Sequence, residues 1–507
     1  MIKNFKWLLL LSLSIAACSS DDSASSEEDV PVTAGSADFS KYVALGNSLT
    51  AGFSDGALFK AGQANAYPNL LASQFSLVGG GEFKTPFTND NVGGLLLGGN
   101  VIQGPRLVFN GVGPVPLPGG VPTTEIGVPL TGPFNNLGVP GAKSFHLLAP
   151  NYGNVAGVLN GTANPYFVRF RSNAANSVLA DAMAQSPTFF SLWIGNNDVL
   201  GFATSGGDGT NPITDEATFT GAYNMLVNTL TSNGAKGVVG NIPDVSTIAH
   251  FKTVPFNPLN PANPAFGPQI PTLNATFAQL NQAFTFLGVP ERSIVFSATA
   301  NSPLVIHDES LTNITPQLTQ VLIAGGVPAP TAGLLANQFG QSRQATKADL
   351  FVLPASSIIA TVNTQYYASL VAQGVPAATA GQLSVNGVTY PLQDKWVLLP
   401  SEQAQITTAV NLFNGIIKAA AESKGLAYVD ANAVLKQLGT TGLRFDNFNM
   451  TGALVQGGTF SLDGIHLTPR ANAVVANEFL KAINLTYGST FRMFKPQEYG
   501  ISYPAGL

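Results

Sequence analysis

Short apolar runs that end in polar turns recur along this chain, and stretches with helical periodicity separate them. Thr468 and Pro469, for example, are typical of the N-cap and first residue of a helix that continues to about residue 483. Strands that alternate with helices favour a parallel sheet with helices on both faces. We therefore expect an α/β fold with three layers, α/β/α. Its clearest strands are residues 42–45, 189–194, 237–240 and 426–429.

Two long segments do not fit this alternation. Residues 78–134 are rich in Gly, Pro and Phe, and residues 251–271 carry six prolines, which exclude a regular helix or a central strand. Residues 272–400 extend the second segment. We predict a single domain over residues 37–507 with large loop and helical insertions at about 78–134 and 251–400.

The second insertion contains an internal repeat. The sequence AGGVPAPTAG at 324–333 matches AQGVPAATAG at 372–381, and LFVLP at 350–354 matches WVLLP at 396–400. The copies span about 321–363 and 369–410, and two copies are too few for a solenoid. We expect a duplicated helical hairpin that forms a cap over the functional site; the alternative is a structural insertion remote from it.

The N-terminus has the pattern of an export signal. Lys3 and Lys6 precede an apolar run that reaches Ile15 and is too short to span a membrane. Ala16-Ala17-Cys18 resembles a bacterial lipoprotein box, which implies cleavage after residue 17 and a lipid anchor on Cys18. The alternative is an ordinary secretory signal with an incidental cysteine. Because Cys18 is the only cysteine, internal disulfides and cysteine-ligated zinc are excluded.

Residues 18–36 are rich in Ser, Asp and Glu, and we expect them to form a disordered acidic tether. An acidic stretch behind a lipidated cysteine resembles the surface-export signal of Bacteroidetes lipoproteins. It implies an outer-membrane lipoprotein exposed at the cell surface; the alternative is a linker on the periplasmic face. The net charge of −5 for the whole chain gives no sign of nucleic-acid binding.

Ser48 is the strongest candidate for a reactive residue. It follows the first predicted strand in Gly46-Asn47-Ser48, and parallel sheets place reactive groups at the carboxyl ends of their strands. A serine nucleophile also needs a base, an orienting acid and oxyanion donors. Among the four histidines, His466 has a carboxylate, Asp463, three residues earlier in a tight loop before a helix. Taken alone, this Asp-x-x-His spacing also fits a structural histidine.

Four segments, in order, resemble the sequence blocks of the SGNH (GDSL-type) hydrolases. The resemblance implies a flavodoxin-like parallel sheet and covers about 150 residues outside the insertions. The classical Gly-x-Ser-x-Gly elbow is absent around Ser48, which argues against an ordinary α/β-hydrolase. The four segments are Gly46-Asn47-Ser48-Leu49, Asn135-Asn136-Leu137-Gly138-Val139-Pro140-Gly141-Ala142, Gly195-Asn196-Asn197-Asp198 and Asp463-Gly464-Ile465-His466.

This resemblance implies a role for each residue. His466, held by Asp463, takes the proton of Ser48 as the serine attacks an ester carbonyl. The oxyanion hole consists of the backbone N–H groups of Ser48 and Gly138 and the side-chain amide of Asn197. The resemblance implies no metal and no other cofactor.

The chain departs from the family pattern at one position beside the nucleophile. The family usually has Asp where this chain has Asn47. An amide can keep the hydrogen bonds of a tight turn while it removes a negative charge near the serine. We therefore expect hydrolytic activity to be retained.

The substrate is expected to be a carboxylic ester. Apolar side chains in 78–134 would suit acyl chains, and a membrane anchor would bring a lipase to lipids; alternatively, these residues pack a core of their own. A carbohydrate esterase that removes acetyl groups from a glycan would use the same triad. A non-catalytic surface binding lipoprotein is the third hypothesis.

Overall fold

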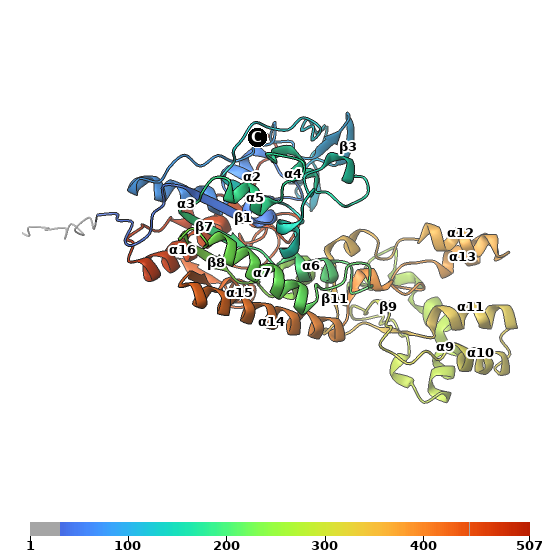
Figure 1. Cartoon of the computed structure of the whole chain (residues 1–507). Helices are drawn as coiled ribbons and strands as arrows, with labels where there is room; N and C mark the ends of the chain where they lie inside the picture. Colours follow the sequence, from blue (N-terminus) through green and yellow to red (C-terminus); the bar gives the residue numbers. More distant parts are fainter. Residues whose placement is uncertain (1–30, 446) are drawn as a thin grey trace, which may run out of the picture.

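The computed structural model describes residues 31–445 and 447–507, and a five-stranded parallel sheet lies at its centre (Figure 1). The spatial order is β13-β8-β7-β1-β6, and all four pairings are parallel. This confirms the predicted α/β class and parallel sheet. The strands are β1 (Tyr42–Gly46), β6 (Asn136–Gly138), β7 (Phe189–Trp193), β8 (Lys236–Gly240) and β13 (Ala427–Val429).

The chain reverses its direction of travel across the sheet beside β1. It passes from β1 to β6 at one edge, then returns to β7 on the other side of β1 and continues outward to β8 and β13. In open α/β sheets such a switch point opens a crevice at the carboxyl ends of the strands, where ligands bind. The ends of β1 and β7 are therefore the expected place for a site.

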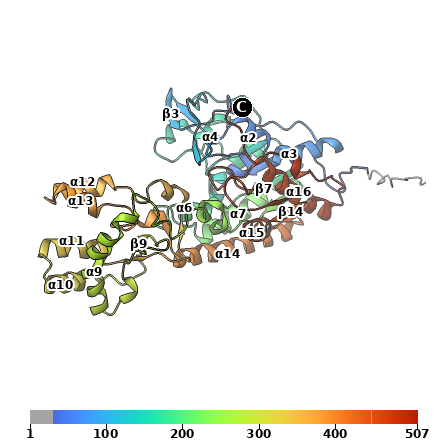
Figure 2. The same cartoon turned by 180° about the vertical axis from the view of Figure 1, so that it is seen from behind.

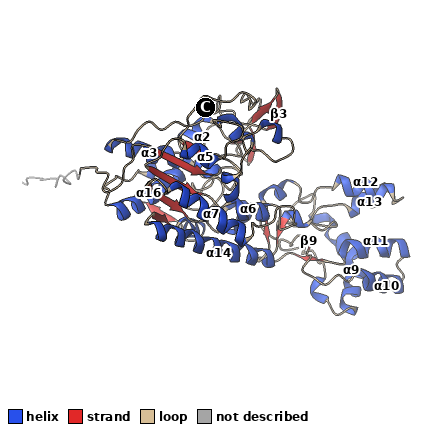
Figure 3. Cartoon of the chain, in the orientation of Figure 1, coloured by secondary structure: helices blue, strands red, loops and turns tan. Residues whose placement is uncertain are grey.

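Helices cover both faces of the sheet, because successive side chains of each buried strand point to opposite sides (Figure 3). From β7, Phe189 and Trp193 contact Tyr487 and Phe479 of α16. The helices α3 (Tyr67–Phe75) and α16 (Pro469–Tyr487) pack together on this face, and α7 (Glu216–Leu230) and α14 (Pro400–Lys424) pack together on the other.

Shorter elements complete the α/β part. The first insertion forms two small β-hairpins, β2–β3 (Leu95–Leu97, Asn100–Gln103) and β4–β5 (Leu107–Phe109, Pro114–Pro116), rather than a featureless loop. A third hairpin, β14–β15 (Leu443–Phe445, Phe448–Met450), precedes α16. The short helices are α1 (Ser48–Ala51), α2 (Lys60–Ala64), α4 (Pro165–Phe170), α5 (Val178–Met183), α6 (Asn197–Thr204), α8 (Ala249–Lys252) and α15 (Ala431–Gly439).

The second insertion has a hydrophobic core of its own, between Val254 and Leu399. It follows α8, which lies beyond the carboxyl end of β8, and it extends away from the sheet (Figures 1 and 2). Its helices are α9 (Ile270–Phe286), α10 (Thr315–Ala324), α11 (Ala329–Phe339), α12 (Thr364–Ala372) and α13 (Ala377–Leu383).

The internal repeat is confirmed as two helical hairpins, α10–α11 and α12–α13. The equivalent segments after each hairpin form β11 (Leu350–Phe351) and β12 (Val397–Leu398), which pair antiparallel with each other. Phe351 faces Val397 in this pair, and these two residues are also equivalent in the repeat. Equivalent residues face each other in this way only when a local two-fold axis relates the copies.

The predicted signal peptide at 1–17 and the lipidation site at Cys18 lie outside the described residues. The predicted tether at 18–36 extends too far, because residues 31–36 are bonded to the segment after α16. Ser36 N–H donates to the Tyr487 carbonyl, and Ser489 Oγ donates to the Ala34 carbonyl. Within the described ranges, none of the helices has the length and apolar character needed to cross a membrane.

Replacing Phe413 by Ala is expected to lower the free energy of unfolding by about 3–5 kcal/mol, because it opens a cavity in the core. The Phe413 ring stacks on Phe219 of α7 with centroids 4.0 Å apart, and this pair joins α14 to α7. Urea unfolding measures the change, and Leu412→Ala, at an exposed position of the same helix, is the control. Equal effects of the two substitutions would contradict this packing.

Candidate active site

Ser48 lies at the carboxyl end of β1 and begins α1. Asn47 caps this short helix: its Oδ1 accepts the Leu49 N–H at 3.0 Å. A carboxylate would accept the same bond, so Asn47 preserves the turn that presents the serine. The Ser48 N–H is the first of α1 and donates to no other described residue, as is usual at a helix start.

His466 is held by Asp463 as the Asp-x-x-His spacing predicts. The His466 Nδ1 lies 2.8 Å from Asp463 Oδ2, and Asp463 Oδ1 accepts the N–H groups of Ile465 and His466, both at 2.9 Å. The ring of Phe53 packs against the imidazole with centroids 4.6 Å apart. These contacts fix the ring and leave Nε2 free for another partner.

The carboxyl group of Asp463 stays ionised in this loop. Burial by itself raises the pKa of Asp463, but the His466 imidazole and the N–H groups of Ile465 and His466 outweigh burial and hold the pKa well below its usual range. An ionised Asp463 accepts a proton-bearing Nδ1, so the unprotonated Nε2 can act as the base.

A turn at residues 54–56 is hydrogen-bonded to the loop that contains His466. Gly56 N–H donates to Asp463 Oδ2 at 2.8 Å, and Asp55 N–H donates to Ser461 Oγ at 2.9 Å. In return, Leu462 N–H donates to Asp55 Oδ1 at 2.9 Å. The sequence gives no signal for these contacts, because Gly56 and Asp463 are 407 positions apart.

Asp55 is buried in this turn and has an unusual charge environment. Burial raises the pKa of Asp55 to about 7; the Leu462 N–H lowers it, Asp463 raises it, and Arg106 and His466 lower it. The Oδ2 atom of Asp55 is buried without a hydrogen-bond partner among the described residues. Asp55 therefore titrates near neutrality, directly behind the carboxylate that orients His466.

Asn197 begins α6, immediately beyond β7, on the other side of the switch point from β6. Its Nδ2 donates to the Ala142 carbonyl at 2.9 Å. The neighbouring Asp198 accepts the N–H and the hydroxyl of Ser144, both at 2.8 Å. These bonds fix the loop after β6 against α6, and the second N–H of the Asn197 amide stays available.

The prediction that Gly138 supplies an oxyanion donor is wrong. The Gly138 N–H is buried in β6 and donates to Asn136 Oδ1 at 3.0 Å. Gly138 is needed for packing instead, since a Cβ there would lie 2.3 Å from the Ala51 nitrogen.

Gly141, three residues after Gly138, has a backbone N–H that could serve as a donor instead. It has φ = +82°, directly precedes the Ala142 carbonyl that binds Asn197, and its N–H donates to no described residue. The signal was present in Pro140-Gly141, a turn dipeptide immediately after the strand. Gly138 was chosen as the donor in place of Gly141 because the sequence does not show that β6 continues to Gly138.

Ser48, Asn197 and His466 line one cavity, together with apolar side chains. All four histidines are described, and His466 is the one that lines this cavity. No direct hydrogen bond joins the Ser48 hydroxyl to His466 among the described residues; such contacts are often loose without substrate. The apolar wall comprises Leu49, Leu200, Pro243, Val245, Ile248, Leu435, Phe460, Ile465 and Leu467.

The cavity has a volume of about 30 Å³, which is room for about two water molecules at about 10–15 Å³ each. Typical ligand pockets measure about 300–1,000 Å³. None of its lining residues comes from 78–134 or 251–400. The predicted cap of duplicated hairpins is not seen at this cavity, because the hairpins extend away from the sheet (Figure 1) and none of their residues lines the cavity.

Two of the other histidines, His146 and His250, have structural surroundings. His146 stacks on Tyr152, and burial together with Lys143 lowers its pKa to about 4. His250 packs beneath the Asp463 loop: its backbone N–H donates to the Gly464 carbonyl, and burial lowers the pKa of its ring. His250 thus supports the loop of the base from below.

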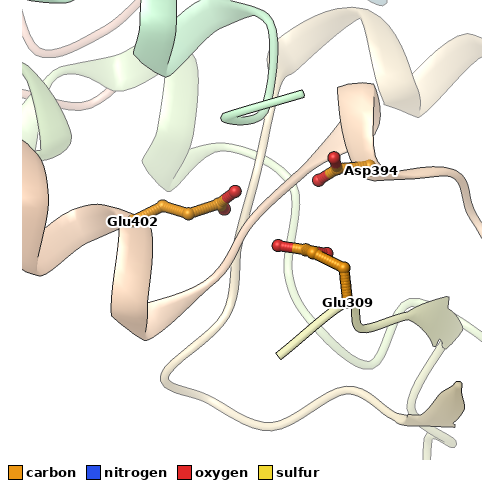
Figure 4. A group of neighbouring side chains, drawn as sticks. All are labelled: Glu309, Asp394 and Glu402. Atoms are coloured by element: carbon orange, nitrogen blue, oxygen red, sulfur yellow. The ribbon is translucent and has the colours of Figure 1, made fainter. Parts of the chain in front are cut away.

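Three carboxylates form the one group in the described residues that is close enough to hold a metal ion. Oxygen atoms of Glu309, Asp394 and Glu402 lie within 4.8 Å of one another and point toward a common centre (Figure 4). Burial, with repulsion from Glu309, Asp208 and Asp308, raises the pKa of Asp394 to about 7. Burial, with repulsion from Glu309 and Asp394, raises the pKa of Glu402 to about 8. None of the three lines the cavity of Ser48.

The sequence matches no protein-family model, no curated protein and no solved structure. The functional assignment therefore rests on the geometry and chemistry of the site itself.

Replacing Glu402 by Gln is expected to reduce the loss of stability at alkaline pH. The folded-state pKa is raised from 4.5 to about 8, so this carboxyl group lowers the stability as pH rises between those values. Gln can still accept the Leu399 N–H that Glu402 binds. Thermal unfolding at about pH 5 and about pH 9 should show a smaller fall in Tm for the variant than for wild type.

The exposed Glu422, on the same helix, is the control: Glu422→Gln should behave like wild type. If Tm falls equally in Glu402→Gln and wild type, ionisation of Glu402 beside the other two carboxylates does not destabilise the fold, and the prediction is wrong.

Proposed function

We propose that this protein is a serine esterase of the SGNH type that hydrolyses carboxylic esters with short acyl groups. One observation carries the proposal: a single cavity at the carboxyl ends of β1 and β7 is lined by Ser48, Asn197 and a His466 already oriented by Asp463. Base, acid and nucleophile come from opposite ends of the chain, and no structural role requires this combination.

In the proposed reaction, His466 Nε2 takes the hydroxyl proton as Ser48 Oγ attacks the ester carbonyl. The Ser48 N–H, the Gly141 N–H and the free N–H of the Asn197 amide hold the oxyanion, and Gly141 replaces the originally predicted Gly138. The protonated imidazole then gives its proton to the leaving alcohol. Water attacks the acyl-Ser48 ester, with His466 again as base.

The size of the cavity supports a short acyl group. A volume of about 30 Å³ accommodates one or two carbon atoms beyond the carbonyl, and the buried side chains of Leu435 and Phe460 are part of the wall that limits it. This favours an esterase for acetyl or similarly short esters over a lipase for long chains. An acetyl esterase that acts on acylated glycans fits the same observation and is the second candidate.

The location follows from the N-terminal pattern. We propose a lipoprotein anchored in the outer membrane through Cys18, which the short export signal and the single cysteine support. The folded domain begins by Pro31, so the proposed acidic tether is shorter than the sequence alone indicated.

Ser48→Ala and His466→Ala are each expected to lower kcat for p-nitrophenyl acetate by at least about 10³-fold, with the fold intact. Asn197→Ala removes one oxyanion donor and should cost about 10²–10³-fold in kcat. Ser76→Ala, at an exposed position that does not line the cavity, is the control. Wild-type rates in the Ser48 variant would remove this serine from the mechanism.

Leu435→Ala is expected to shift the preference toward longer acyl groups. Removing the side chain deepens the cavity, so the ratio of kcat/KM for the hexanoate over the acetate ester should rise by about tenfold or more. Leu438→Ala is the matched control, because Leu438 is also buried in α15 but does not line the cavity. Equal ratios in both variants would show that Leu435 does not limit acyl length.

A further inference from the structure

The two helical hairpins of the second insertion carry no charge. Residues 310–342 and 350–393 contain no Asp, Glu, Lys, Arg or His, whereas the chain as a whole is 10% charged. Both hairpins extend into solvent (Figures 1 and 3), where charged side chains are normally common. Two neighbouring uncharged arms are unsuited to nucleic acid or to any strongly charged polymer.

A cavity of about 420 Å³ lies where the two copies of the repeat meet. Asn337 of α11 lines it from the first copy, and Tyr366 of α12 and Tyr390 line it from the second. Its volume is within the range of about 300–1,000 Å³ typical of ligand sites. It shares no lining residue with the cavity of Ser48, so it is a separate site.

Two stacked tyrosines form one wall of this cavity. The rings of Tyr366 and Tyr390 lie 4.2 Å apart between centroids and 26° from parallel, and both are only partly buried. The Tyr366 hydroxyl donates to Gln338 Oε1, and Gln393 Nε2 donates to the Tyr390 hydroxyl. Burial raises the pKa of Tyr366 to about 12, so this hydroxyl stays neutral. The aromatic surface is thus rigid and uncharged.

Unused hydrogen-bonding groups surround the tyrosines. The Asn337 side chain and the His307 ring line the cavity, and neither has a side-chain hydrogen bond to another described residue. An amide and an imidazole both donate and accept, which is what hydroxyl groups require. Asp394 is the single acidic residue in the wall, no Lys or Arg lines it, and an anionic ligand would be repelled.

We propose that this cavity binds a neutral saccharide, with a pyranose ring packed on the tyrosine wall and its hydroxyl groups bonded to Asn337 and His307. The apolar C–H face of a sugar ring packs on an aromatic face, and its hydroxyl groups pair with neutral amides. The site stands independently of the esterase proposal: it would hold a glycan whether or not Ser48 is catalytic.

The test is native affinity electrophoresis of the full folded protein in gels that contain arabinoxylan, galactomannan, mixed-linkage β-glucan or starch. At least one of these neutral polysaccharides should retard wild type, and Tyr390→Ala should weaken that retardation at least tenfold. Tyr367→Ala is the matched control, since Tyr367 lies on the same helix as Tyr366 and does not line the cavity. Its retardation should equal that of wild type.

Asn337→Ala is the second variant, at an exposed helix position where folding is not at risk. It should weaken retardation at least threefold even if Tyr390→Ala fails to fold. Both variants should keep wild-type rates on p-nitrophenyl acetate, and Ser48→Ala should keep wild-type retardation. Lack of retardation by all four polysaccharides, stronger retardation by polygalacturonate, or unchanged retardation in Asn337→Ala would overturn the saccharide site.

Discussion

The clamp between the turn at 54–56 and the loop at 461–467 is the constraint on which the candidate site depends. Ser48 is placed locally, at the end of β1, whereas His466 lines the same cavity because Gly56, Asp55 and Ser54 bind the loop that contains the imidazole. Four hydrogen bonds between buried or partly buried groups join the first and last parts of the chain. If one of these hydrogen bonds breaks, a buried polar group is left without a partner, which is unfavourable. The loop is therefore held in a single position.

The clamp also helps to fix the orientation of the Asp463 carboxylate. Asp463 accepts from Gly56, Ile465 and His466, so every oxygen is bonded before substrate arrives. A preorganised acid and base cost no reorganisation during reaction. Asp55, which titrates near neutrality behind Asp463, adds a second carboxyl group whose ionisation would reach the triad through Leu462 and the loop.

Local patterns predicted the elements, but the exact end of a strand and contacts between distant segments were not readable from them. The strands around Ser48 and Asn197 and the capped start of α16 follow from periodicity and turn residues that lie within a few positions. Gly138 was misassigned because its partner, Asn136, depends on the exact end of β6. The boundary at residue 36 failed for a different reason, because Ser36 bonds to Tyr487, which is far away in the sequence.

The internal repeat was readable as a duplication, but its orientation was not. Which way the hairpins point depends on how β11 pairs with β12 and on the separate core of the insertion, and neither is visible in the repeat itself. The two proposals place recognition at two separate cavities, a small one beside Ser48 for the acyl group and a wider one between the hairpins for an uncharged sugar. Together they favour an acylated neutral glycan over a lipid.

The most direct measurement is active-site labelling with a fluorophosphonate probe, followed by peptide mapping. Such a probe reacts only with a serine whose proton is taken by a neighbouring base, so it reports on Ser48 and His466 at once. The account predicts one labelled residue, Ser48, in the folded wild type, and at least a hundredfold slower labelling in His466→Ala. A folded protein that stays unlabelled, or that is labelled elsewhere, would contradict it.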